Sequence, residues 1–229
     1  MTNTRMTAPA VVLIHGFNGE PADVAYLHNY LTIRGFKVYM LKVKGHADSR
    51  IDMARHGCQS WISGVRDDVR AISREHESLY VVGFSMGGLL AVNLLDYFTI
   101  QKLVFVNTPI YVWNSRQIVA NIRNDLKNRH YGNLKYYLSA SHNAPLPALL
   151  NFLRILFLTK PRFKNINVNT LILQNKDDDT VQPRSALYIK KHLREAAELI
   201  WFETGGHMMF LDERKEDAAK AVYAFLKGE

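Results

Sequence analysis

The sequence predicts an α/β fold in which a mostly parallel central sheet of about six or seven strands is flanked by helices. Short apolar runs rich in β-branched residues alternate with helical segments along the chain, a pattern typical of a parallel sheet covered on both faces. The 229 residues are 48% hydrophobic, which suffices for one large core, and no linker or repeat interrupts them. We expect residues 1–112 and 165–229 to form this core and residues 113–164 to form a small helical cap inserted into it.

Each expected strand is a short apolar run bounded by polar or glycine-containing stretches. The strands are expected at residues 11–14, 37–41, 79–82, 102–106, 170–174 and 199–202. A first covering helix begins at Pro21 and ends before Gly35, and a second is expected at residues 61–74, directly after Ser60. Further helices are expected at residues 89–98 and 184–193.

The expected cap, residues 113–164, differs from the rest of the chain in charge. It holds nine Lys or Arg residues and one acid, Asp125, so it accounts for the whole net charge of +8. Within it, residues 147–158 have only Asn151 and Arg154 as polar side chains, so a helix there is covered by the body, lines a pocket, or touches lipid. Two interpretations of the basic residues carry equal weight: they attract anionic ligands or an anionic surface, or they are a solvated face over a packed helix.

The most informative motif is Gly83-Phe84-Ser85-Met86-Gly87-Gly88, which follows the third expected strand and opens a helix. A serine on a strand-to-helix turn is typical of a nucleophile elbow, where a strained turn presents the hydroxyl group and small residues on either side leave room for the bend. Phosphate-binding loops and dinucleotide-binding loops need glycines at other spacings, so the motif favours a catalytic serine.

The first strand runs into His15-Gly16-Phe17-Asn18-Gly19. Glycines after a buried strand allow the backbone to turn and to aim an N–H group into a cleft, so we expect the N–H groups of Phe17 and Met86 to bind an oxyanion. His15 precedes the nucleophile in the chain and is expected to be a structural residue beneath this loop.

An acid and a base follow two later strands. Asp177, Asp178 and Asp179 come shortly after the fifth strand, and His207 follows two glycines after the sixth. The carboxyl ends of parallel strands meet at one edge of a sheet, so these side chains can reach Ser85. Spacing alone leaves each of the three aspartates as a candidate acid, and we expect the other two to bind turn and helix-start amides.

These motifs resemble those of the α/β-hydrolases, most closely the small bacterial carboxylesterases that also resemble monoacylglycerol lipases. The resemblance runs nearly end to end, from the His-Gly-Phe loop and the Gly-x-Ser-x-Gly-Gly elbow to an acid shortly before Val181 and Pro183 and the pair Gly206-His207. It favours Asp178 as the acid. The family tends to have Gly-His-Gly after its second strand, where this chain has Gly45-His46-Ala47, a departure that concerns a loop near the site.

The resemblance implies a serine carboxylesterase that hydrolyses short- to medium-chain carboxylic esters, monoacylglycerols among them, through an acyl-enzyme on Ser85, with Asp178 and His207 completing the triad. Substrate contacts are expected from Gly16, Asn18, Tyr111, Trp113 and Met208. A thioesterase, a C–C bond hydrolase or a haloperoxidase would share this frame and stays an alternative. A protein of this fold that only binds a ligand is the least favoured interpretation.

No metal or other cofactor is expected, because the nine histidines form no metal-binding pair on a helix, and His46 and His56 are expected at the surface or in loops. No nucleic-acid motif accompanies the basic residues, so the expected partner is a small ester substrate, with at most weak contact to an anionic surface through the cap. The single cysteine, Cys58, excludes an internal disulfide and suits a cytoplasmic protein, for which we expect neither a signal peptide nor a membrane span. The sequence leaves the oligomeric state open.

Overall fold

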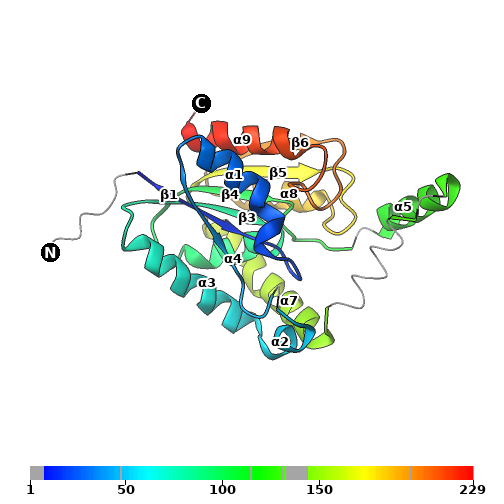
Figure 1. Ribbon diagram of the computed structural model, residues 1–229, viewed down its shortest axis with the longest axis horizontal. Coiled ribbons are helices and arrows are strands. Elements are labelled where there is room, and N and C mark those ends of the chain that lie inside the picture. Colours follow the sequence, from blue (N-terminus) through cyan, green and yellow to red (C-terminus); the bar gives the residue numbers. More distant parts are fainter. Residues whose placement is uncertain are drawn as a thin grey trace.

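The structure, a computed structural model, describes residues 8–46, 48–113, 115–129, 131–132, 144–195 and 197–228 (Figure 1). Its described residues form one six-stranded sheet in the spatial order β2-β1-β3-β4-β5-β6, and every neighbouring pair of strands is parallel. The strands are β1 (Ala10–Ile14), β2 (Lys37–Leu41), β3 (Leu79–Phe84), β4 (Ile100–Val106), β5 (Asn169–Asn175) and β6 (Ala197–Phe202). The predicted parallel sheet is confirmed, and the strands differ from their predicted bounds by a residue or two.

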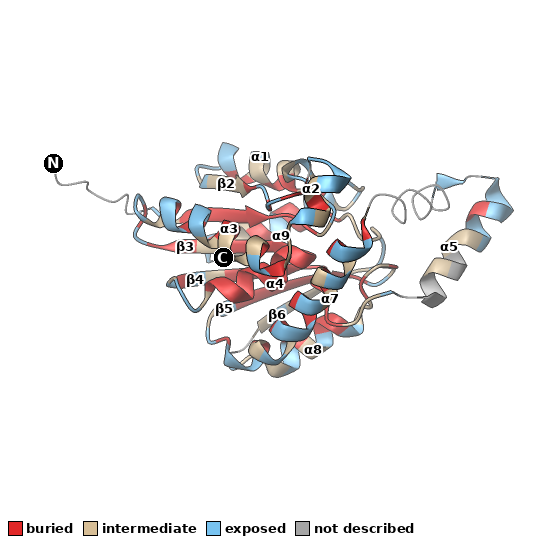
Figure 2. Cartoon of the chain, turned by 90° about the horizontal axis from the view of Figure 1, so that it is seen from below, coloured by how far each residue is buried: buried red, intermediate tan, exposed pale blue. Residues whose placement is uncertain are grey.

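Alternate side chains of the strands point to opposite faces of the sheet and build two separate cores. On one face, Val12 and Ile14 belong to a core completed by four helices. These helices are α3 (Cys58–Ser73), α4 (Met86–Leu94), α7 (Leu146–Thr159) and α8 (Arg184–His192). On the other face, Val11 and Leu13 pack with α1 (Ala25–Ile33) and α9 (Lys215–Lys227). Figure 1 shows the two helical layers on either side of the sheet, and Figure 2 shows that the inner strands of the sheet are buried.

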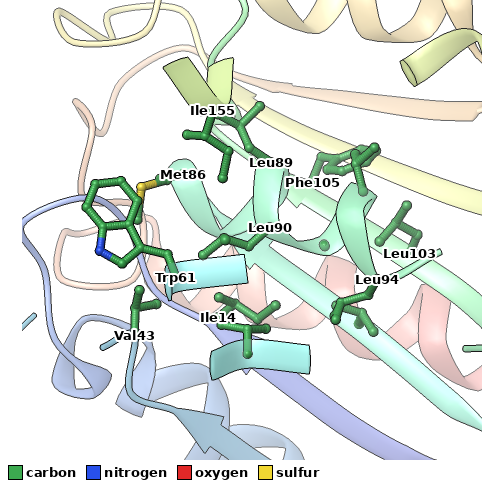
Figure 3. Close-up of a cluster of buried hydrophobic side chains, with 14 of the residues drawn as sticks. Ile14, Val43, Trp61, Met86, Leu89, Leu90, Leu94, Leu103, Phe105 and Ile155 are labelled. Atoms are coloured by element: carbon green, nitrogen blue, oxygen red, sulfur yellow. The ribbon is translucent and has the colours of Figure 1, made fainter. Parts of the chain in front are cut away.

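Helix α4 is buried along its whole length, from Met86 to Leu94. A helix that is apolar all round must be covered on every side, and α4 is enclosed by the sheet, α3 and α7. Figure 3 shows Leu89 and Leu90 of α4 among side chains from these neighbours, including Ile155 of α7. The helix predicted at residues 89–98 starts and ends earlier than expected, because α4 begins directly after Ser85 and ends at Leu94.

Two helices start differently from the sequence prediction. Helix α3 begins at Cys58 and not at Trp61, because Gly57 takes the N-cap position while the Ser60 hydroxyl pairs with the ring of His56. The helix expected from Pro21 begins with a 3-10 turn, η1 (Pro21–Val24), which leads into α1. Helices α2 (Arg50–Arg55) and α9 were not predicted from the sequence.

The predicted cap contains α5 (Ser115–Asn128), α7 and the 3-10 helix η2 (Lys160–Asn165). Helix α7 packs against α2, α3 and α4, whereas α5 extends away from the sheet in both views (Figures 1 and 2). Residues 133–143, among them the predicted cap residues Lys135, Tyr136 and Tyr137, lie outside the described residues. A single cap over residues 113–164 therefore stays a prediction.

Among the described residues, none of the helices combines the length and the apolar composition that crossing a bilayer requires.

Candidate active site

Ser85 occupies a strained turn between β3 and α4. Its backbone has φ 52° and ψ −123°, a region that residues other than glycine rarely adopt. A Cβ atom at Gly83 would lie 2.4 Å from the backbone N of Gly88, and one at Gly87 would lie 2.1 Å from the carbonyl oxygen of Ile14. Glycine at both positions therefore allows the sharp turn that carries Ser85 at the carboxyl edge of the sheet.

Ser85, His207 and Asp178 form a continuous chain of hydrogen bonds. The Oγ atom of Ser85 lies 3.0 Å from Nε2 of His207, and Nδ1 of His207 lies 2.9 Å from Oδ2 of Asp178. A carboxylate accepts hydrogen bonds, so the proton of the neutral imidazole is on Nδ1 and the Nε2 lone pair faces the serine hydroxyl. This arrangement can remove the proton from Ser85.

Asp178 is fully buried and its other oxygen is also engaged. Oδ1 accepts hydrogen bonds from the backbone N–H groups of Thr180 at 2.9 Å and Val181 at 2.8 Å. Burial raises the pKa of the Asp178 carboxyl group above its ordinary value, while His207 and the two amides oppose that rise. The carboxylate is thus held in one orientation against the imidazole.

The two neighbouring aspartates make different contacts. Asp177 accepts hydrogen bonds from the backbone N–H groups of Gly205 at 3.2 Å and Gly206 at 2.9 Å. Asp179 accepts hydrogen bonds from the Thr180 hydroxyl at 2.9 Å and from the side-chain amide of Asn121 in α5 at 3.1 Å. Of the three, Asp178 is the one whose carboxylate bonds to His207.

Two asparagines to which the sequence analysis assigned no role position the loop that carries His207. Asn107 follows β4 with φ 45°, and its side-chain amide donates to the carbonyl oxygen of His207 at 2.9 Å. The same side chain accepts the backbone N–H of Asn175 at 3.0 Å, and the side-chain amide of Asn175 donates to the carbonyl oxygen of Gly206 at 2.7 Å. A polar residue directly after an apolar strand was the only sequence signal for Asn107.

The electrostatic surroundings of His207 favour its protonated form. Its side chain is 9% exposed, and this burial alone would lower the imidazole pKa. Charge and hydrogen bonding from the Asp178 carboxylate, together with the charges of Asp179 and Asp23, outweigh that effect, so the pKa of His207 is raised above 6.5. The ring is therefore a stronger base than an isolated histidine.

The two predicted oxyanion segments lie against the serine. A Cβ atom at Gly16 would be 3.0 Å from Cβ of Ser85, so the backbone next to Phe17 passes close to the nucleophile. Met86 is the first residue of α4, and the first N–H groups of a helix have no acceptor within the helix. That the N–H groups of Phe17 and Met86 bind an oxyanion stays a prediction.

His15 lies beneath this loop with both ring nitrogens next to backbone atoms. Nδ1 lies 2.9 Å from the carbonyl oxygen of Gly16, and Nε2 accepts the N–H of Val43 at 3.1 Å. These contacts require a neutral ring with its proton on Nδ1. Burial lowers the pKa of His15 to about 4, against the hydrogen bond to Gly16, so the ring is suited to a structural role.

The remaining predicted substrate contacts have mixed surroundings. Asn18 is exposed with φ 56°, Trp113 is half-exposed with φ 56°, and Met208 packs against the core on the α1 and α9 face. Tyr111 is half-buried, and its backbone N–H donates to the hydroxyl of Ser185 at 3.0 Å. Between Tyr111 and Trp113, Val112 pairs with Val181 in an isolated antiparallel bridge. The bridge fixes the chain at the point where it leaves the site.

Comparisons with known proteins place the chain among hydrolases. It is 24% identical over 226 residues to a carboxylesterase of Bacillus subtilis (strain 168), covering 95% of this chain and 92% of that protein. It is 25% identical over 214 residues to a thermostable monoacylglycerol lipase of Bacillus sp. (strain H-257), covering 88% of this chain and 84% of the lipase.

Solved structures share the fold. One of two metagenome-derived lipolytic enzymes matches with a TM-score of 0.79 and 20% identity, covering 99% of this chain and 96% of that one. A meta-cleavage product hydrolase matches with a TM-score of 0.71 and 19% identity, covering 98% of this chain and 93% of that one. The bromoperoxidase of Bacillus anthracis matches with the same TM-score and identity, covering 97% of this chain and 93% of its own. Residues 6–214 match the family described as serine aminopeptidase, S33. The resemblance inferred from the motifs is thereby confirmed, and the chain belongs to this family of α/β-hydrolases.

Proposed function

We propose that the chain is a serine carboxylesterase acting on short- to medium-chain carboxylic esters, monoacylglycerols among them. The hydrogen-bonded chain from Ser85 through His207 to Asp178 carries this proposal. The similarity to a carboxylesterase and a monoacylglycerol lipase over nearly the whole chain supports an ester as the substrate.

The first chemical step is attack on the ester carbonyl. Nε2 of His207 takes the proton of Ser85 as the serine oxygen bonds to the carbonyl carbon, and Asp178 stabilises the resulting imidazolium. The N–H groups of Phe17 and Met86 bind the oxygen that becomes negative, and each such donor is worth about 3 kcal/mol of the barrier. His207 then gives its proton to the departing alcohol.

The second step releases the acid. Water loses a proton to Nε2 of His207 and attacks the acyl group on Ser85, and collapse of the intermediate returns the proton to the serine oxygen. His207 acts as base and acid in both halves of the reaction, so its orientation by Asp178 and Asn107 matters throughout.

The test is hydrolysis of p-nitrophenyl esters from acetate to palmitate, and of monoacylglycerol, by the wild type, Ser85→Ala and the control Ser73→Ala near the end of α3. We expect Ser85→Ala to lose roughly a million-fold in turnover, as when a triad nucleophile is removed, and a phosphonate directed at serine to label every protein except this variant. Equal turnover by the wild type and Ser85→Ala would remove Ser85 as the nucleophile.

The alternative chemistries give distinct outcomes. Acyl-coenzyme A cleavage faster than that of any oxygen ester would identify a thioesterase, which uses the same steps on a sulfur leaving group. Without any ester or thioester hydrolysis, C–C bond cleavage and haloperoxidase activity are assayed next, since this fold carries both chemistries.

For residues 113–164, the proposal is a cap whose apolar helix α7 lines the acyl pocket. Ala148, Phe152 and Ile155 of α7 are buried, whereas Leu150 and Phe157 are exposed. The basic residues of this segment then attract anionic esters or an anionic surface, or serve only as a solvated face. Rates on anionic esters that fall with salt while rates on neutral esters do not would favour attraction. A cytoplasmic location also stays a proposal, to be tested by cell fractionation.

A further inference from the structure

Two buried polar atoms near the predicted oxyanion loop have no hydrogen-bond partner among the described residues. They are Nε2 of His46 and Nε1 of Trp61. The exposed fractions of these residues are 1% and 0%, and their rings lie 5.2 Å apart at an interplanar angle of 76°. A buried polar group without a partner is costly, so two of them side by side require an explanation. His46 is thus in a loop, as expected, but not at the surface.

The two atoms have complementary hydrogen-bonding roles. Nδ1 of His46 lies 3.3 Å from the carbonyl oxygen of Lys44, which only accepts, so the proton is on Nδ1 and Nε2 is an acceptor. Burial lowers the pKa of His46 to about 4 despite that hydrogen bond, so the ring is neutral near pH 7. The Nε1–H group of Trp61 is a donor only. A single hydroxyl group placed between the two atoms would donate to Nε2 of His46 and accept from Nε1–H of Trp61, which would satisfy both.

Both rings also contact the oxyanion loop. The ring of Phe17 lies 5.9 Å from that of His46 and 6.1 Å from that of Trp61, and on another side it lies 5.0 Å from the ring of Phe152 in α7. Figure 3 shows the side chain of Met86 directed toward the Trp61 indole. Trp61 therefore adjoins both residues whose N–H groups are expected to bind the oxyanion.

We infer that His46 and Trp61 form a binding position for one hydroxyl group next to Phe17, and that its occupancy holds the oxyanion loop in its working geometry. The hydroxyl group belongs either to a water molecule or to the alcohol portion of the substrate. The hydroxyl position stands on the two polar atoms alone, whereas its effect on the oxyanion loop rests on the proposed esterase function.

The test is a double-mutant cycle of Trp61→Phe, His46→Phe and the double variant, with Trp201→Phe on β6 as the matched control. Trp61→Phe removes the donor and keeps a ring, and His46→Phe removes the acceptor in the same way. The kcat and KM are measured on a monoacylglycerol and on the propyl ester of the same acid, and thermal unfolding is followed without substrate. Because the two atoms serve one hydroxyl group, each single variant should show about a tenfold fall in kcat or a tenfold rise in KM. The double variant should change the same constant hardly more.

The pattern of losses distinguishes the two sources. With a water molecule, kcat falls equally on both esters while KM stays, and the cycle is also non-additive in thermal unfolding. With a substrate hydroxyl group, KM rises for the monoacylglycerol and the propyl ester is unaffected. Additive losses throughout, or single variants that match the wild type, would overturn the inference.

Two further outcomes of this experiment also bear on the hydroxyl position. If His46→Phe does not fold, Trp61→Phe alone decides. A fall in kcat or a rise in KM beyond that of Trp201→Phe supports the position, and wild-type values overturn it. If the wild type hydrolyses no ester, the proposed function fails. A crystal structure of the wild type then decides the position separately: an ordered water between Nε2 of His46 and Nε1 of Trp61 supports it, and its absence overturns it.

Discussion

The Oδ1 atom of Asn151 in α7 accepts a hydrogen bond from the backbone N–H of Cys58, the first residue of α3, at 3.1 Å. Gly57, the residue before Cys58, has no side chain with which to cap α3. A Cβ atom at Gly57 would lie 2.8 Å from Oδ1 of Asn151, so the glycine also makes room for the bond. The apolar helix α7 is therefore tied to the body by a specific polar contact as well as by packing.

Asn151→Ala should lower the free energy of unfolding by about 1 kcal/mol, the usual cost of losing a helix N-cap. Asn151→Asp keeps an acceptor at the helix start and should recover most of this loss. Urea unfolding of the three proteins measures the difference, and equal stability of wild type and Asn151→Ala would show that the cap contributes nothing.

Asp178→Asn should lower turnover about ten-thousand-fold, because the amide no longer fixes the imidazole with its proton on Nδ1. Asp177→Asn and Asp179→Asn should cost much less, since neither carboxylate bonds to His207. Turnover on a p-nitrophenyl ester compares all three. A larger loss at position 177 or 179 would move the role of triad acid to that residue.

Ester hydrolysis should rise with pH through one ionisation whose midpoint lies above 6.5. The base must be neutral to accept the Ser85 proton, and the pKa of His207 is raised by Asp178, so activity is lost as the pH falls through that raised value. The dependence of kcat/KM on pH, measured with a substrate whose chemistry limits the rate, gives the midpoint. A midpoint at 6.5 or below would contradict the electrostatic description of the site.

His15 and His46 should each make the folded protein less stable as the pH falls from 6.5 toward 4, whereas His207, whose pKa is raised, acts in the opposite direction. His15 and His46 have pKa values lowered to about 4 by burial, so below 6.5 the unfolded chain binds protons that the folded chain does not. By pH 5 each ring should cost about 2 kcal/mol of unfolding free energy. Urea unfolding at pH 7 and pH 5 should therefore show a smaller decrease for His46→Gln than for wild type, and an equal decrease would contradict this role of His46.

Gly87→Ala should destabilise the protein by about 3 kcal/mol or prevent folding, because the new Cβ atom would meet the backbone of Ile14, which cannot move aside. Gly35→Ala is the matched control. Its Cβ atom would meet no heavy atom within 4 Å, so only the φ of +92° opposes it, at about 1 kcal/mol. Thermal unfolding of both variants separates the steric effect from backbone strain.

The strands were predictable because each is a contiguous run whose apolar character is local, as in the fully buried run of β1, Ala10–Ile14. The elbow and the loop before His207 were predictable for a related reason, since glycines at fixed offsets report a backbone requirement. In both cases the signal lies within a few neighbouring residues.

Contacts between distant segments were not predictable in this way. The start of α3 depends on Asn151, which lies 93 residues further along the chain. The roles of Asn107 and Asn175 appear only once β4, β5 and the His207 loop are side by side. Nothing next to His46 in the sequence indicates that Phe17 and Trp61 bury it.

The bridge between Val112 and Val181 lies where the predicted cap segment leaves the core. On one side of it, Val181 donates its N–H to Asp178, so the bridge joins the loop of Asp178 to the segment that follows β4. On the other side, residues from Trp113 onward still contact the site, because Trp113 donates its N–H to the carbonyl oxygen of Thr180 at 2.8 Å and α7 packs against α4, which begins directly after Ser85. A change in this segment is therefore transmitted at once to the loop of Asp178 and to the helix that follows Ser85.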